Sequence, residues 1–278
     1  MELSDALGWA RQQIGTSSDS AALDAEVLLA HCIGKSRSYL YTWPEQVLTA
    51  THWDRYQSLI AQRLIPTPIA YLLGKREFFS LDFKTTAAAL IPRSDTELLV
   101  EAALHRCPEH SSFKILELGT GTGAIAITLK VHRPDAKVVA TDISPQCLVL
   151  AGQNGKHHQV DIDWTASDWF SAIKPSERFD MIVSNPPYIA GDDVYLTQGD
   201  LPAEPLLALS SGLTGLESLW QIITDSPDYL NSGGYLLLEH GYDQEMAVIG
   251  LLKSRGFVNV SCQYDVNNLP RISMGQFI

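Results

Sequence analysis

The second half of the sequence alternates short apolar runs with helical stretches, and this alternation restricts the fold more than any other feature. Four runs have the length and composition of buried strands, at residues 114–118, 137–141, 180–184 and 235–239. Stretches with the spacing of helices separate them, such as 124–131 and 146–154. This order predicts an α/β fold with an open, mostly parallel sheet and helices on both faces. Ligands of such sheets bind beyond the carboxyl ends of the strands, so residues that follow the strands are the candidates for a site.

The first 65 or so residues have helical periodicity instead. Apolar residues recur every three or four positions in 3–14, 23–30 and 53–64, and Pro66-Thr67-Pro68 ends the pattern. We predict a helical bundle at 1–68 that recognises a substrate protein, an aromatic hairpin or linker at 69–92, and an α/β domain at 93–278. Within the last part, Ser94 and Glu97 have the spacing of a capping box for a helix that runs to about Arg106.

Composition argues against several classes of protein. No apolar run approaches the roughly 20 residues of a membrane span, and the first residues lack the basic and apolar parts of a secretory signal. We therefore expect a cytoplasmic protein. We also expect a monomer. The 4 cysteines and 8 histidines show no metal-ligand spacing, which predicts neither a disulfide framework nor a metal site. The net charge is −12, and no Lys or Arg occurs from Phe179 to Leu252. Such a surface is unfavourable for binding the phosphates of a nucleic acid.

A glycine loop connects the first predicted strand to the next helix and consists of Gly119, Thr120, Gly121, Thr122 and Gly123. Glycine permits positive φ and lets the backbone approach a ligand, and the helix that follows leaves amides free to donate. Asp142 ends the next strand, where a carboxylate can accept from ribose hydroxyls. Gly119, Gly121 and Ala124 also satisfy the pattern G-x-G-x-x-G/A, so an NAD- or flavin-dependent oxidoreductase is an alternative for this loop.

The strand at 180–184 leads into the tetrapeptide Asn185-Pro186-Pro187-Tyr188. A carboxamide nitrogen is a poor nucleophile, and its two N–H groups need acceptors when it is buried. The Asn185 side-chain oxygen and the Pro186 carbonyl supply two acceptors, the prolines stiffen the loop, and Tyr188 offers a flat face for stacking. The sequence around this motif suggests no Ser or Cys nucleophile with a nearby histidine and no carboxylate pair, so hydrolytic chemistry is not indicated. The motif therefore predicts methyl transfer to a planar amide or amino nitrogen from an activated electrophile, such as the sulfonium of S-adenosylmethionine.

Taken together, these motifs resemble the HemK/PrmC family, the glutamine methyltransferases that modify peptide chain release factors. The resemblance covers nearly the full length. The motifs that carry it are Pro68-Ile69-Ala70-Tyr71-Leu72, Arg76-Glu77-Phe78, Leu90-Ile91-Pro92-Arg93-Ser94-Asp95-Thr96-Glu97, the glycine loop, Ser167-Asp168-Trp169-Phe170, Ser184-Asn185-Pro186-Pro187-Tyr188-Ile189 and Leu238-Glu239-His240-Gly241. Asn-Pro-Pro-Tyr alone is shared with adenine and guanine amino methyltransferases. The Ile-Pro-Arg-x-Asp-Thr-Glu segment narrows the resemblance to this family.

The resemblance implies a Rossmann-like class I S-adenosylmethionine-dependent methyltransferase domain with a small all-helical N-terminal domain. The glycine loop and Asp142 would bind the methionine and ribose parts of the cofactor, and Asp168 and Trp169 would flank its adenine. Asn185 would contact both cofactor and substrate, and the rest of its motif, Pro186, Pro187 and Tyr188, would complete the glutamine pocket. The family methylates N5 of the glutamine in the Gly-Gly-Gln loop of release factors, which leaves S-adenosylhomocysteine and needs no metal.

The resemblance does not decide the roles of two motif residues and one loop. Arg93 and Glu97 lie near the active site in the family, although Glu97 also suits a cap. The family often has a basic or aromatic pair before Glu-Pro, whereas this chain has Leu201-Pro202-Ala203-Glu204-Pro205. We expect residues 189–217 to form part of the rim of the acceptor site.

Three other functions remain as alternatives. An adenine or guanine amino methyltransferase acting on DNA or RNA shares both sites but needs a basic surface or a target-recognition domain, and neither is apparent. An oxidoreductase leaves Asn-Pro-Pro-Tyr unexplained. A non-catalytic S-adenosylmethionine-binding module predicts cofactor binding without turnover.

Overall fold

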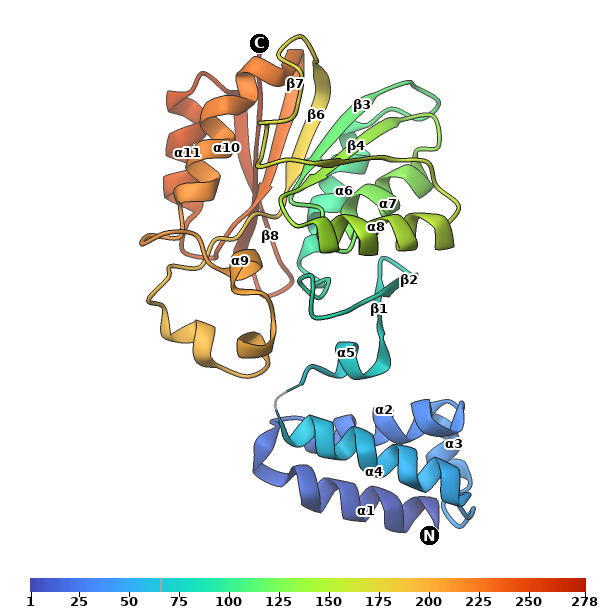
Figure 1. The fold of residues 1–278 in the computed structure, drawn as a ribbon. Helices are drawn as coiled ribbons and strands as arrows, with labels where there is room; N and C mark the ends of the chain where they lie inside the picture. The colour runs from blue at the N-terminus through green and yellow to red at the C-terminus, as the bar shows by residue number, and fades with distance from the viewer. Residues whose placement is uncertain (66) are drawn as a thin grey trace. The chain divides into compact units, whose positions relative to one another are not determined.

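The computed structural model of the chain describes residues 1–65 and 67–278, which form two compact units. The first unit comprises Met1–Lys75 with Thr197–Ala203, and the second comprises Arg76–Leu196 with Glu204–Ile278 (Figure 1). The predicted N-terminal bundle, 1–68, was a single segment, whereas the first unit includes a second segment far along the chain.

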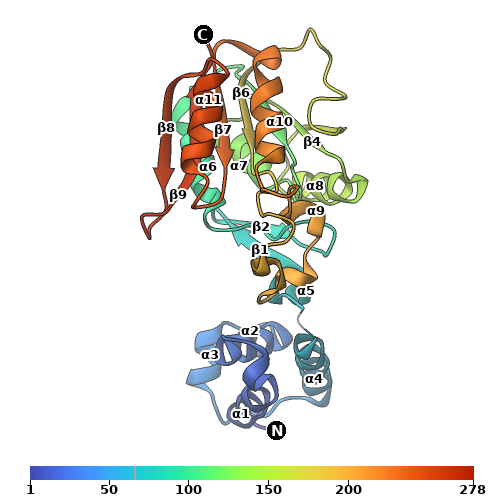
Figure 2. The ribbon, with the colours of Figure 1, turned by 90° about the vertical axis from the view of Figure 1, so that its left-hand side faces the viewer.

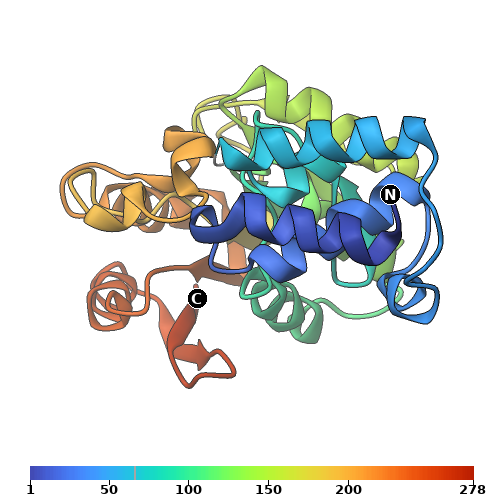
Figure 3. The same ribbon diagram turned by 90° about the horizontal axis from the view of Figure 1, so that it is seen from below.

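The first unit is helical, as its periodicity predicted. Its elements are α1 (Leu3–Ile14), η1 (Gly15–Ser17), α2 (Ala21–Ile33), α3 (Arg37–Thr42), α4 (Ala50–Leu64), α5 (Ile69–Leu73) and η3 (Leu201–Ala203). In Figure 3, α1 in dark blue and α4 in lighter blue run side by side. Leu7 from α1, Leu28 from α2 and Tyr56 from α4 lie in one buried cluster, and the Thr49 hydroxyl caps α4 by accepting from the His52 N–H at 3.2 Å.

Buried charges tie the two segments of the first unit together. The Arg63 side chain is only 6% exposed, and it donates to Asp24 Oδ2 at 2.8 Å and to Asp200 Oδ1 at 2.6 Å. A buried guanidinium is tolerated only when it is paired and hydrogen-bonded. The segment that carries Asp200 therefore supplies part of the counter-charge for a residue of α4.

The second unit is built on a seven-stranded sheet with the order β5-β4-β3-β6-β7-β9-β8. Its strands are β3 (Lys114–Leu118), β4 (Lys137–Asp142), β5 (Asp163–Ala166), β6 (Phe179–Ser184), β7 (Leu230–Glu239), β8 (Val258–Tyr264) and β9 (Pro270–Gln276). Neighbouring strands from β5 to β7 in this order are parallel to each other. β9 lies between β7 and β8 and is antiparallel to both. The open, mostly parallel sheet is thus confirmed, and the four predicted strands coincide with β3, β4, β6 and the second half of β7.

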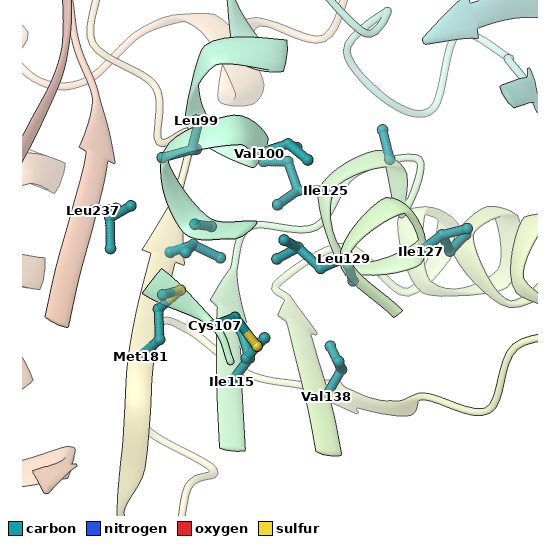
Figure 4. Packing of buried hydrophobic residues seen from close by; sticks show 14 of the residues in the cluster. Leu99, Val100, Cys107, Ile115, Ile125, Ile127, Leu129, Val138, Met181 and Leu237 are labelled. Atoms are coloured by element: carbon teal, nitrogen blue, oxygen red, sulfur yellow. The ribbon is translucent and has the colours of Figure 1, made fainter. Parts of the chain in front are cut away.

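Helices cover both faces of this sheet. α6 (Thr96–Arg106), α7 (Ala124–His132) and α8 (Pro145–His157) lie on one face, and α10 (Glu217–Asp225) and α11 (Glu245–Ser254) lie on the other (Figure 2). Side chains alternate along a strand. Accordingly Ile115, Met181 and Leu237 pack with α6 and α7 (Figure 4), whereas their neighbours Leu116, Ile182 and Leu236 pack with α10 and α11. The central strands of the sheet are buried on both faces, so their ends are left for a ligand.

A hairpin precedes α6 and includes the expected aromatic residues. It consists of β1 (Lys75–Phe78) and β2 (Leu81–Lys84), joined by Phe79 and Ser80 with φ of 51° and 61°. Two positive φ values in a two-residue turn match the twist of a hairpin. The Glu97 carboxylate accepts the Phe79 N–H at 2.9 Å. The predicted capping box is therefore wrong: Asp95 is the N-cap, without a side-chain cap bond, because Glu97 is held by the hairpin.

The remaining elements lie in the loops that follow β6 and α10. They are η2 (Val194–Thr197), α9 (Leu206–Leu209) and η4 (Ser226–Tyr229).

Candidate functional site

A cavity of about 390 Å³ lies beyond the carboxyl ends of the parallel strands. The register aligns these ends, since Leu118 of β3 pairs with Thr141 of β4 and with Ser184 of β6. The residues predicted from sequence that line the cavity are Gly119, Thr120, Gly121 and Thr122 after β3, Asp142 at the end of β4, Asp168 and Trp169 after β5, and Asn185 and Pro187 after β6. The topology therefore brings both predicted motifs to one cavity.

Three predicted residues have other positions. Among the described residues that line the cavity, Gly123, Pro186 and Tyr188 are not included. Gly123 packs behind the loop at φ +83°, where a Cβ atom would lie 2.9 Å from Ile127 Cδ1 and 3.1 Å from Ala151 Cβ. Both the tight packing and the positive φ at position 123 therefore favour glycine.

The glycine loop is held by hydrogen bonds to the neighbouring strand. Gly119 and Gly121 have φ of +73° and +55°, a region that glycine adopts without steric cost. The Thr120 N–H donates to the Thr141 carbonyl at 2.8 Å, and the Gly121 N–H donates to Asp142 Oδ2, also at 2.8 Å. The loop is therefore fixed before any ligand arrives.

Asp142 can accept further hydrogen bonds besides the one that holds the glycine loop. Its Oδ1 accepts the Ser144 N–H at 2.9 Å, in addition to the Gly121 bond, and a carboxylate offers about four lone-pair sites. Burial raises the pKa of Asp142, and the N–H groups of Ser144 and Gly121 oppose that rise. A ligand hydroxyl that donates to the free sites would favour the carboxylate further.

Glu117 is a cavity residue that the sequence interpretation missed. It lies inside β3, only 1% exposed, and lines the cavity. Its Oε2 accepts from the Thr120 hydroxyl at 2.6 Å and from the Ala126 N–H at 3.1 Å, whereas its Oε1 is buried without a partner in residues 1–65 and 67–278. Burial raises the pKa of Glu117 to about 8. An acidic residue inside an otherwise apolar strand was the signal available in the sequence.

The Asn185 carboxamide has one end fixed and one end open. Its Nδ2 donates to the Thr96 hydroxyl at 3.0 Å. Within the described chain no residue donates to its Oδ1 or to the Pro186 carbonyl. Thr96, at the start of α6, also lines the cavity and is a second residue that the sequence interpretation missed.

Tyr188 is fixed by its hydroxyl. This group donates to Glu239 Oε1 at 3.2 Å, at the end of β7. Burial raises the pKa of Tyr188 well above its ordinary value, and the nearby Glu239 carboxyl adds to the effect. Tyr188 is thus a neutral donor to a buried acid.

The loop that follows the Asn185–Tyr188 tetrapeptide also reaches the cavity. Pro205, Leu207, Ala208 and Ser210 belong to the cavity lining, so part of the segment 189–217 lies at the cavity, and its role as a rim of the acceptor site stays a prediction. Glu204, only 6% exposed, anchors this loop: it accepts the Ile91 N–H at 3.0 Å and pairs with Arg93. Arg93 lines the cavity, whereas the carboxylate of Glu97 serves the hairpin.

The described residues offer neither a cluster of metal ligands nor a helix that could span a membrane. Within residues 1–65 and 67–278, no group of three or more His, Cys, Asp or Glu side chains has an arrangement that could hold a metal ion. In the same residues, every helix is too short or too polar to span a bilayer.

Comparisons with known proteins agree with this geometry. Residues 5–74 match the model of the PrmC N-terminal domain, and residues 94–200 match that of the methyltransferase small domain. The release factor glutamine methyltransferase of Shewanella oneidensis is 43% identical over 277 residues, 99% of this chain and 96% of the relative. That of Escherichia coli K12 is 42% identical over 272 residues, 97% and 98% of the two chains.

Solved structures share the fold at low sequence identity. A methyltransferase from Pyrococcus furiosus aligns with a TM-score of 0.54 and 20% identity, over 80% of this chain and 98% of its own. The catalytic domain of hMettl16 aligns with a TM-score of 0.55 and 17% identity, over 79% and 82% of the two chains. Likeness at this level of identity is evidence for the fold alone.

Proposed function

Since the chain belongs to the release factor glutamine methyltransferase family, we propose that it transfers a methyl group from S-adenosylmethionine to N5 of the glutamine in the Gly-Gly-Gln loop of peptide chain release factors. The observation that carries the proposal is the Asn185 carboxamide, whose nitrogen is bound to Thr96 and whose oxygen is open, beside a glycine loop in one cavity. Such a group can hold an amide N–H next to a bound cofactor.

The glycine-loop side of the cavity suits the cofactor. When bound, S-adenosylmethionine supplies a methyl group already activated by its positively charged sulfur. The bare Oε1 of Glu117 suits a cation, because a buried oxygen without a partner gains most from a positive neighbour. Asp142 and the loop from Gly119 to Gly123 would hold the ribose and methionine parts, and Asp168 and Trp169 would flank the adenine.

The acceptor side works by holding the glutamine amide. Asn185 Oδ1 and the Pro186 carbonyl would each accept one N–H of the substrate, which aims the nitrogen. Positive charge develops on this nitrogen as the new bond forms, so the two acceptors bind more strongly in the transition state. Pro187, which lines the cavity, would complete the pocket, and Tyr188, which lies outside the lining, would support it through its hydrogen bond to Glu239. The transfer breaks the bond from sulfur to the methyl group, leaves S-adenosylhomocysteine and releases one proton of the amide nitrogen, and it requires no metal.

The surroundings of the cavity favour a protein substrate. Leu206, Leu207 and Leu213 are 63%, 65% and 83% exposed in the loop that lines it, and large exposed apolar side chains are typical of protein contacts. Residues 179–252 contain no Lys or Arg, which disfavours a phosphate backbone. We assign recognition of the release factor to these residues and to the helical first unit, with a monomeric enzyme.

The test is methyl transfer from labelled S-adenosylmethionine to a purified release factor. A release factor with Gln→Ala in its Gly-Gly-Gln loop and a DNA or RNA sample serve as controls. Label in the unaltered factor alone supports the proposal. Label in nucleic acid would replace it with an amino methyltransferase, and cofactor binding without any labelled product would leave a non-catalytic module.

A further inference from the structure

A turn that follows β7 holds the carboxyl end of the Asn185–Tyr188 tetrapeptide. Gln244 donates from its Nε2 to the Tyr188 carbonyl at 2.9 Å, and its Oε1 accepts the Gly241 N–H, also at 2.9 Å. The Gly241 carbonyl accepts the Gln244 N–H at 3.0 Å, which closes the turn. The Gln244 carboxamide therefore connects the end of β7 to the tetrapeptide through two hydrogen bonds.

Tyr188 is thereby held at two points by one short segment. Its hydroxyl donates to Glu239 Oε1 at 3.2 Å, and its carbonyl accepts from Gln244, further along the same segment. The carbonyl is also enclosed, because a Cβ atom at Gly215 would collide with this oxygen and lie 3.0 Å from Gln244 Nε2. Removal of the donor would leave an enclosed carbonyl unpaired, which is costly.

The tetrapeptide depends on bonds from other segments because of its prolines. Pro186 and Pro187 have no N–H, so they cannot donate to a neighbouring strand. At the beginning of the tetrapeptide, Asn185 Nδ2 donates to the Thr96 hydroxyl at 3.0 Å. The bond from Gln244 is the corresponding anchor at its end.

The side chain of Gln244 does not serve the helix that begins there. Gln244 is the N-cap residue of α11, and within the described residues its side chain makes no capping bond, although caps favour Ser, Thr, Asp and Asn. Its two ends have partners of opposite kind, since a carbonyl only accepts and an N–H only donates. A carboxamide satisfies both partners at once, and an ionised carboxylate cannot. The position therefore suits glutamine rather than glutamate.

The anchor reaches the cavity through the neighbours of Tyr188. The Ile189 N–H donates to the Leu209 carbonyl at 3.0 Å, and the Ser211 N–H donates to the Ile189 carbonyl at 2.9 Å. Ser211 lines the cavity, and so does Pro187, which precedes Tyr188. A shift of Tyr188 would therefore move cavity-lining residues on both sides of it in the sequence.

We propose that Gln244 is a positioning residue that fixes the carboxyl end of the tetrapeptide, and with it the adjoining cavity wall, for the methylation of glutamine. Gln244 acts through Tyr188, because it is not among the described residues that line the cavity. The inference rests on the proposed function, since the position of this wall affects turnover only if the substrate amide is held beside it.

Gln244→Glu tests the anchor in the full-length enzyme, because it keeps the size of the side chain and removes the donor. The ionised carboxylate would face the Tyr188 carbonyl, so the tetrapeptide should move away from it. We expect kcat to fall about 100-fold, the loss typical of a reacting group misplaced by about 1 Å. The Kd for S-adenosylmethionine should stay within about twofold of wild type, because the glycine loop is held by other bonds. Gln244→Ala should lower kcat by a smaller factor, since it adds no repulsion.

Gln276→Glu is the matched control. Gln276 is half-buried like Gln244, its Nε2 donates to the Gly233 carbonyl at 2.9 Å, and its Oε1 accepts from Asn259 Nδ2 at 3.0 Å. None of these residues is among the described residues that line the cavity. The control should lower resistance to urea but leave kcat near the wild-type value. Equal losses of kcat in Gln244→Glu and Gln276→Glu, on a substrate that the wild type labels, would indicate a purely structural role and overturn the inference.

Hydrogen exchange separates this inference from the proposed function, because it needs no substrate. The amides of Ile189 and Ser211, resolved by NMR, should exchange about tenfold faster in Gln244→Glu than in the wild type. The Thr120 amide, which donates to the Thr141 carbonyl, should keep its rate. Unchanged exchange at Ile189 and Ser211 would overturn the inference even if the wild type labels a release factor. Faster exchange would support it even if the label enters another substrate, an outcome that would refute the proposed function alone.

Discussion

The carboxylate of Glu204 accepts the backbone N–H of Ile91 at 3.0 Å, across 113 positions of sequence. The same carboxylate pairs with Arg93, which lines the cavity. The loop that follows the acceptor motif is therefore attached to the segment that precedes α6. This contact gives Arg93 a defined partner and gives Glu204 an anchoring role in this chain, although the residues before it depart from the pattern common in the family.

Glu204→Ala should lower kcat/KM for the release factor about tenfold, because it leaves the Ile91 N–H unpaired and frees the loop from Arg93. Steady-state kinetics with varied release factor would measure the loss. Arg93→Ala should add little in the Glu204→Ala background, since contacting residues are not additive. Fully additive losses would argue that the two side chains act separately.

Asn185→Ala should lower kcat by about 10²–10³, the cost of removing a group that stabilises developing charge. Calorimetry should show a Kd for S-adenosylmethionine within a few-fold of wild type, because the glycine loop and Asp142 remain. Turnover near the wild-type rate would disprove the positioning mechanism.

Glu117 should couple cofactor binding to proton release. Burial raises its pKa to about 8, so the free protein holds this proton at neutral pH, and a cation at the bare oxygen favours the carboxylate. Binding therefore expels a proton, and affinity for S-adenosylmethionine rises as pH increases from 6 toward 8. Calorimetry in buffers of different ionisation heat would detect the proton. Glu117→Gln should bind with a pH-independent affinity in this range, and a wild type that releases no proton would contradict the assignment.

Gly123→Ala should destabilise the protein by roughly 1–3 kcal/mol, because its Cβ would crowd a packed site and its backbone has φ +83°. Gly152 in α8 is a suitable control, since a Cβ there would meet nothing within 4 Å. Gly152→Ala should stabilise the helix by about 0.5–1 kcal/mol. Urea denaturation measures both changes, and equal effects would show that crowding at Gly123 is unimportant.

Binding of the release factor should weaken as salt rises. The stretch 179–252 lacks Lys and Arg, and Asp192 and Asp193 are exposed within it, so a substrate with basic flanks would be attracted. Titrations of the binding affinity at 50, 150 and 400 mM salt would show the trend, because screening acts over about 8 Å near 150 mM. An affinity independent of salt would exclude electrostatic guidance.

The strands that the sequence predicted are those buried on both faces. β3, β4, β6 and the end of β7 have continuous apolar runs, which is the mark of a central parallel strand. The edge strands β5 and β8 carry mostly half-exposed or exposed residues, so their sequences lack that mark. β9 is largely buried, but it lies inside the sheet only because β7 and β8 flank it, a relationship that is not local in sequence.

The candidate site divides in a similar way. The glycine loop, Asp142 and Asn185 were found because each follows a strand directly, and strand ends meet at one edge of the sheet. Thr96 is bonded to Asn185, 89 positions away, and Glu204 to Ile91 and Arg93, 113 and 111 positions away, so the local sequence did not reveal their roles. Glu117 was missed although it is an acid inside an apolar strand, and Glu239 entered only as part of a family motif. The partners of both residues lie outside their own strands.

The pairing of Arg63 with Asp200 has an evolutionary consequence. These residues are 137 positions apart, yet they share one buried charge balance in the helical unit. A chimaera that takes its N-terminal third, with the arginine, from one relative and the rest from another keeps this pairing only if position 200 of the second parent carries a carboxylate. We therefore expect the two positions to be inherited together, and chimaeras between relatives to succeed only when that carboxylate is present.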